Sequence, residues 1–144
     1  MLRRFLSFFG LLVLSSLSAE SVTTHAPIVE IGVEGLTKVE VTARNNGTLP
    51  IACGAAIAHW YSVDIGRAAL GDTVRVTVWY DAARGAVFLL NTENVRLPIE
   101  TLWCGVEGRS WETRAVVPLR NQAGEKPGPI SLDCAESRGR LHCH

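Results

Sequence analysis

The chain has 144 residues, 14 of them basic and 14 acidic, and 47% are hydrophobic. This balance excludes the strongly basic nucleic-acid-binding proteins, because neutralising phosphates requires a basic face. It also excludes polybasic binders of membrane surfaces, while the length suffices for one domain with its own core.

The first nineteen residues have the layout of a secretory signal peptide. Arg3 and Arg4 precede an apolar run from Phe5 to Leu17, and small residues follow at Ser18 and Ala19. The run is shorter than the roughly 20 residues of a transmembrane helix. We therefore expect cleavage after Ala19 or Ser18, no stable membrane insertion afterwards, and a periplasmic or secreted protein. The alternative is an uncleaved anchor.

The predicted mature part, residues 20–144, has its own composition. Removing Arg3 and Arg4 takes the 14 basic residues to 12, against 14 acidic ones, which is a net charge of −2. Lysine then occurs only at Lys38 and Lys126, against ten arginines. We interpret this bias as that of a GC-rich bacterial genome.

Strand patterns recur at short, even intervals along the chain, and no segment shows a helical period. Turn residues fall at 45–50, 81–85 and 91–94, and a Gly/Pro-rich linker covers 122–129. Between them, strands are expected at 28–33, 36–43, 51–63, 74–78, 86–90, 99–106, 111–119 and in a terminal hairpin at 130–144. About eight or nine short strands predict a single all-β domain, an antiparallel sandwich or barrel.

All four cysteines lie in the part predicted to be exported. An even number in an oxidising compartment predicts two disulfides, for which three connectivities exist. Cys134 and Cys143 flank a turn at 137–139, so a bridge between them would close the terminal hairpin. Cys53 and Cys104 would then join two distant strands. A zinc site is disfavoured because no two cysteines have C-x-x-C spacing.

Two segments resemble the immunoglobulin-like domains of bacterial envelope proteins. From Lys38 to Ile51, an alternating strand ends in Asn and is followed by a polar turn and Pro. From Ala69 to Val78, a Gly precedes an alternating strand. The resemblance implies an immunoglobulin-like β-sandwich and assigns no functional residue. One departure from antibody domains is Trp60, which follows Cys53 too closely for their buried-Trp pattern.

No complete catalytic set is found, so a non-enzymatic protein without a cofactor or a metal is expected. There is no Gly-x-Ser-x-Gly turn, and no glycine-rich phosphate loop. Met1, the only methionine, would leave with the signal peptide, which excludes thioether copper transfer. The nearest candidates for ligand chemistry are His59, a possible base or metal ligand, and Tyr61, which shares its face of a strand. The alternative is that this segment is an ordinary core strand.

Tryptophan and arginine in the second half indicate a contact surface, because both residue types dominate interface hot spots. Gly105 to Ser110 is predicted to be a loop, so Arg109 within it and Trp111 just after it are the preferred surface candidates. Trp103 is expected to pack in the core against a disulfide. The leading hypothesis is a periplasmic accessory domain that binds another envelope protein or complex. The alternatives are a small-ligand or metal binder that uses His59 and Tyr61, and an inhibitor of a hydrolase.

Overall fold

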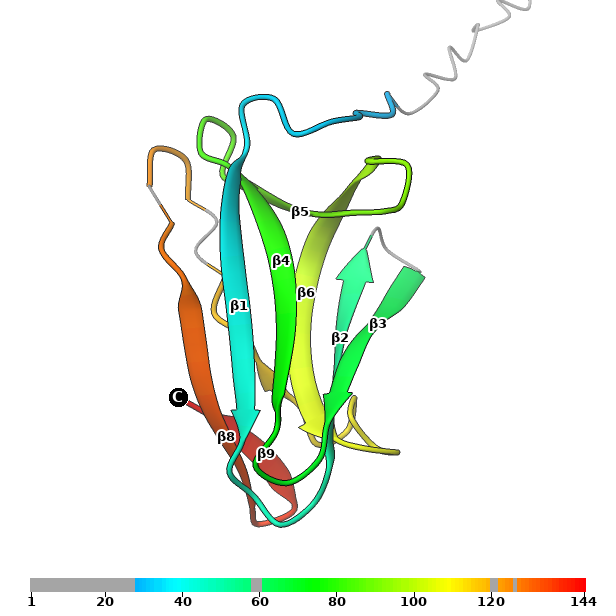
Figure 1. The fold of residues 1–144 in the computed structure, drawn as a ribbon, viewed down its shortest axis with the longest axis vertical. Helices are drawn as coiled ribbons and strands as arrows, with labels where there is room; N and C mark the ends of the chain where they lie inside the picture. The colour runs from blue at the N-terminus through cyan, green and yellow to red at the C-terminus, as the bar shows by residue number, and fades with distance from the viewer. Residues whose placement is uncertain (1–27, 58–60, 120–121, 126) are drawn as a thin grey trace, which may run out of the picture.

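The computed structural model describes residues 28–57, 61–119, 122–125 and 127–144. Within these residues it contains strands and no helix (Figure 1), so the predicted all-β class is confirmed, and no helix there could cross a membrane. The predicted signal peptide lies outside the described residues. The strands are β1 (Thr37–Asn45), β2 (Ile51–Ile57), β3 (Tyr61–Ala68), β4 (Thr73–Asp81), β5 (Ala86–Leu90), β6 (Arg96–Val106), β7 (Ala115–Val116), β8 (Ile130–Ser137) and β9 (Arg140–Cys143).

All these strands belong to one hydrogen-bonded sheet, in the order β3-β2-β6-β5-β4-β1-β8-β9, with β7 paired to β6. The long strand β6 connects the two parts of the sheet, because it pairs with β5 through Arg96 to Pro98 and with β2 through Ile99 to Val106. Side chains from both parts meet in one buried cluster, so the sheet folds over on itself. The structure therefore shows a single folded sheet where two separate sheets were expected.

The sheet is not purely antiparallel, because β8 lies parallel to β1, with Val41 opposite Ile130. The other pairings are antiparallel. The reason is the long connection between β7 and β8, which returns the chain to the end of the sheet at which β1 enters. A hairpin turn could only have produced an antiparallel neighbour.

Alternation along β1 and β4 builds one side of the core. Val39 lies opposite Val78, and Ala43 lies opposite Val74, and these four side chains are buried. The residues between them, such as Glu40, are exposed. A period of two with one buried face is the pattern that predicted these strands.

Three predicted strands differ in the structure. The apolar run at 51–63 covers β2 and the first residues of β3. Because β2 lies between two neighbouring strands and is apolar over most of its length, the sequence pattern did not separate the two strands. Residues 28–33 form only an isolated bridge between Ile31 and Val95. The run at 111–119 contains only the two residues of β7.

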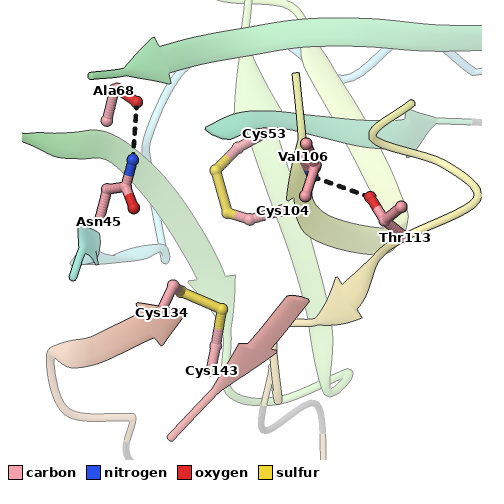
Figure 2. The surroundings of a disulfide bond; sticks show 8 residues. All are labelled: Asn45, Cys53, Ala68, Cys104, Val106, Thr113, Cys134 and Cys143. Carbon is pink, nitrogen blue, oxygen red and sulfur yellow. Dashed lines mark hydrogen bonds between the residues drawn. A yellow bond between two sulfur atoms is a disulfide. The ribbon is translucent and has the colours of Figure 1, made fainter. Parts of the chain in front are cut away.

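Both predicted disulfides are present, Cys53–Cys104 and Cys134–Cys143, and the terminal hairpin is confirmed. Each joins residues that lie directly opposite one another in antiparallel strands, with Cα–Cα distances of 4.0 and 4.1 Å. Figure 2 shows the two bonds, from β2 to β6 and from β8 to β9. Two such bonds indicate an oxidising, non-cytoplasmic compartment.

Asn45, at the end of β1, is the buried polar centre of this end of the sheet. Its side-chain amide donates to the carbonyl oxygens of Leu49, Ala68 and Ala69 at 2.9 to 3.2 Å, and Figure 2 shows the bond to Ala68. Its side-chain oxygen accepts from the Gly47 N–H. One fully buried side chain thus holds the turns on both sides of it, as expected for a buried amide that is fully hydrogen-bonded.

Two arginines hold the segment before β1 against the end of the sheet. The Arg84 guanidinium donates to both carboxylate oxygens of Glu30, at 2.6 and 2.7 Å. Arg96 donates to the same carboxylate and to the carbonyl oxygens of Gly32 and Glu34. The segment is therefore fixed mainly by charged hydrogen bonds, while Ile31 is exposed.

These contacts make the attachment of residues 30–34 sensitive to acid. The hydrogen bond from Arg84 holds the pKa of Glu30 below its ordinary value of 4.5, with Arg96 acting in the same direction. Because the folded-state pKa is the lower one, the contact is fully stabilised above the unfolded-state pKa and is lost as pH falls through the folded-state value. In a pH titration by NMR, the amides of Gly32 and Arg96 should therefore shift together below about pH 4.5. A Glu30→Gln chain should lack this titration, and an unchanged titration in that variant would contradict the assignment.

Candidate functional site

The outer face of β2, β6 and β7 carries a row of residues that the core does not use. Gly54 on β2 lies opposite Trp103 on β6, which in turn lies opposite Val116 on β7. The next residue of β6, Cys104, points the other way, into the core. Strand alternation thus places Trp103 on the outer face, away from the disulfide. Trp103 is buried, as expected, but it lies outside the core cluster that contains Cys53 and Cys104.

Gly54 makes room for Trp103. A Cβ atom at Gly54 would lie 2.9 Å from Cζ2 of the Trp103 ring, closer than ordinary carbon contacts. The ring can therefore lie flat over β2 and reach 94% burial, with 6% of the residue exposed. Gly54 and Trp103 are thus complementary in size on the outer face.

The segment 107–114, here called the groove loop, folds back over β6 from its end. A side chain at Gly105 would overlap the carbonyl group of Ser110, so only glycine permits this close approach. Thr113, buried to 3% exposure, fastens the loop: its hydroxyl accepts from the Val106 N–H and donates to the Arg109 carbonyl, both at 2.8 Å. Figure 2 shows the contact between Thr113 and Val106.

The groove loop places Trp111 on top of Trp103. The two ring centroids lie 4.9 Å apart, with the rings at 79° to one another, an edge-to-face arrangement. The Arg114 guanidinium lies 3.7 Å from the centroid of the Trp111 ring and donates to the Trp111 carbonyl at 2.6 Å. Trp111 is nevertheless 53% exposed. It is a large exposed aromatic side chain that its neighbours hold in one orientation.

Beside the two tryptophans the surface is hollowed into a groove of about 460 Å³, which spans the outer face from β3 to the groove loop. Arg67 on β3 bridges two carboxylates, those of Asp64 at 3.5 Å and Glu107 at 3.2 Å. The floor is flat because β2 contributes small residues. The lining residues are Ala52, Cys53, Gly54, Ser62, Val63, Asp64, Arg67, Trp103, Glu107, Gly108, Arg109, Ser110, Trp111 and Glu112.

Both predicted surface residues, Arg109 and Trp111, line this groove. Among the described residues, the Arg109 side chain has no ion-pair or hydrogen-bond partner, so its guanidinium is available. Arg67 and Arg114 were not singled out from the sequence. Neither has a local signal, since their roles depend on where the groove loop returns across the sheet.

The other predicted pair is not brought together by the described structure. Tyr61, 69% exposed, begins β3 and does not line the groove. His59 lies outside the described residues, so a ligand site at this pair stays a prediction. In the part of the chain that is described, no group of three or more His, Cys, Asp or Glu side chains is placed to hold a metal ion.

A second hollow, of about 450 Å³, lies between Tyr80 and the proline-rich segment 127–129. The described residues that line it include no charged side chain. The described lining of this hollow contains no exposed aromatic side chain and no arginine, whereas that of the groove contains both, so the groove is the stronger candidate. Comparison of the chain with family models, with curated proteins and with solved structures finds no match.

Proposed function

We propose that this is an exported, non-enzymatic accessory domain that binds another envelope protein or complex through the groove. The observation that carries the proposal is Trp111, exposed but held by Trp103 and Arg114, on the same groove as the exposed Arg109, whose side chain has no partner among the described residues. A side chain held in one orientation loses little conformational entropy on binding. Trp and Arg are also the residues that most often contribute large binding energies.

Export to the periplasm is the second part of the proposal. It is supported by the signal-peptide layout of the first nineteen residues and by two disulfides, which form and persist in oxidising compartments. The N-terminal sequence of the protein recovered from periplasmic extract would test it. A chain that begins at or next to Glu20 supports cleavage.

We further propose that the folded sheet is related in architecture to immunoglobulin-like envelope domains. The two segments that carry the resemblance fall largely on β1 and β4, which pair along most of their length, from Thr37 with Tyr80 to Arg44 with Thr73. The two segments therefore lie side by side in the sheet, and this supports the proposed relationship in architecture.

The binding surface can be tested in two steps. A photoreactive side chain at Ser110 in the groove, and another at Arg75 on the exposed face of β4, would capture partners in the periplasm of living cells. The partner captured only from Ser110 is then purified, and its affinity is measured for the unaltered chain and for an Arg109→Ala/Trp111→Ala chain. We expect a loss of about 2 kcal/mol or more, roughly thirtyfold in Kd.

A matched variant controls for general effects of removing one arginine and one large apolar side chain. Arg75→Ala/Leu70→Ala removes the same kinds of side chain from exposed positions outside the groove, since Leu70 is exposed and neither residue lines the groove. Its affinity should equal that of the unaltered chain. Equal affinities for all three chains would overturn the proposal.

A further inference from the structure

We propose that the C-terminal hairpin, β8 and β9, positions the groove loop, and that opening its disulfide with a dithiol loosens the groove. The consequence for binding rests on the function proposed above. The structural claim concerns only the contacts of residues 106–114 and can be tested without a partner.

The contact between the hairpin and the groove loop is made by Thr113. The Leu141 N–H, on β9, donates to the Thr113 carbonyl at 2.7 Å. The same threonine fastens the loop through its hydroxyl, which joins the Val106 N–H to the Arg109 carbonyl, and through its own N–H, which also donates to that carbonyl. Thr113 therefore contacts the hairpin through its backbone carbonyl and holds the loop through its hydroxyl and its N–H.

The disulfide determines how firmly β9 is held. β9 has four residues and is the last strand in the sheet order, with β8 as its strand partner. Cys134 and Cys143 lie opposite one another at the end of this ladder, next to the paired backbones of Asp133 and His144. A short edge strand frays readily, and the covalent bond opposes fraying at the end where the chain stops.

The two bonds differ in the burial of their cysteines. Cys53, Cys104 and Cys134 are buried, with at most 4% exposed, whereas Cys143 is partly exposed. Of the four residues, Cys143 is therefore the one at which we expect an external thiolate to attack first. Exchange at that position is controlled by access as well as by thiol chemistry.

A dithiol reduces the Cys134–Cys143 bond in two thiol–disulfide exchange steps. The first thiolate attacks Sγ of Cys143, the Cys134–Cys143 bond breaks, and Cys134 leaves as a thiolate and takes up a proton. The second thiol of the reagent then attacks the reagent sulfur in the mixed disulfide and releases Cys143. Two electrons and two protons pass to the protein, and the dithiol becomes a disulfide.

The experiment uses limited reduction of the purified native protein with dithiothreitol. Alkylation and peptide mapping should show Cys134 and Cys143 modified while Cys53 and Cys104 remain joined. Hydrogen exchange of the Val106, Arg109 and Thr113 amides should then rise roughly tenfold or more. The β1 amides that face β4 should keep their protection. First reduction at Cys53–Cys104, or unchanged exchange at the three loop amides, would overturn the proposal.

Two variants at Thr113 test the hydroxyl contacts that fasten the loop, with both disulfides intact. Thr113→Val keeps the shape and removes the hydroxyl, so it should raise exchange at Val106 and Arg109 as reduction does. Thr113→Ser keeps the hydroxyl and should retain most of the protection. Equal exchange in the two variants would contradict the positioning role of the hydroxyl.

Partner affinity separates this inference from the proposed function. A loosened loop with weaker partner binding supports both. A loosened loop with unchanged affinity supports the positioning role and shows that the groove is not the binding surface. A rigid loop after reduction rejects the positioning role, whatever the affinity.

Discussion

Replacing both Cys53 and Cys104 with alanine is expected to lower the free energy of unfolding by about 4 kcal/mol. The bond closes a loop with a sequence separation of 51, and the unfolded chain loses more conformational entropy the longer the loop that is closed. Both residues also belong to the buried cluster between the two parts of the sheet. Urea unfolding followed by circular dichroism would measure the change.

The second disulfide provides the matched control. Cys134→Ala/Cys143→Ala opens a loop with a sequence separation of 9, for which the same entropy model gives about 2 to 3 kcal/mol. The two double variants remove the same atoms, so their difference isolates loop length and position. If the terminal pair proved the more destabilising, loop closure would not be the main contribution of these bonds.

Asn45→Ala is expected to cost about 3 kcal/mol of stability, because buried groups that lose their partners are costly. The substitution removes the donor to Leu49, Ala68 and Ala69 and the acceptor for the Gly47 N–H. Water cannot replace these contacts easily at a fully buried position. Thermal and urea unfolding should both report the loss.

A substitution at the neighbouring Asn46 separates the effect of burial from the effect of removing an asparagine. Asn46 is exposed and its side chain makes one hydrogen bond, to Asp133. Asn46→Ala should therefore change the free energy of unfolding by less than about 1 kcal/mol. Similar losses in both variants would show that the turn as a whole, rather than the buried amide of Asn45, is what stabilises this end of the sheet.

The elements that the sequence predicted well are those in which one face is buried. In β4, Val74, Val76 and Val78 alternate with polar residues, and β5 was bounded correctly because turn residues flank it on both sides. β3 was not separated from β2 in the prediction, because the sequence between Ile57 and Tyr61 contains no Gly, Pro or Asn that would indicate a break. The parallel pairing of β8 depends on a long connection, about which local pattern carries no information.

The residues of the candidate site were also predictable from the sequence only in part. Residue type and a predicted loop together indicated Arg109 and Trp111 as surface residues, and both line the groove. The face of Trp103 could also have been derived, because its neighbour Cys104 has to point toward Cys53 and alternation then turns Trp103 outward. Arg114 could not have been found, since its place over the Trp111 ring depends on how Thr113 is held by Leu141 on β9, a contact that the local sequence does not reveal.

The parallel pairing of β1 with β8 has a consequence for the order of folding. The side chains of Thr42 and Ser131 bond across 89 residues of sequence, so β1 cannot gain this neighbour until β8 is free to pair with it. Contacts between residues so far apart form slowly, because a long stretch of chain must first be closed. Until then the open side of β1 can pair with other strands. Protection of this unpaired edge of β1 therefore matters most in the interval before β8 docks.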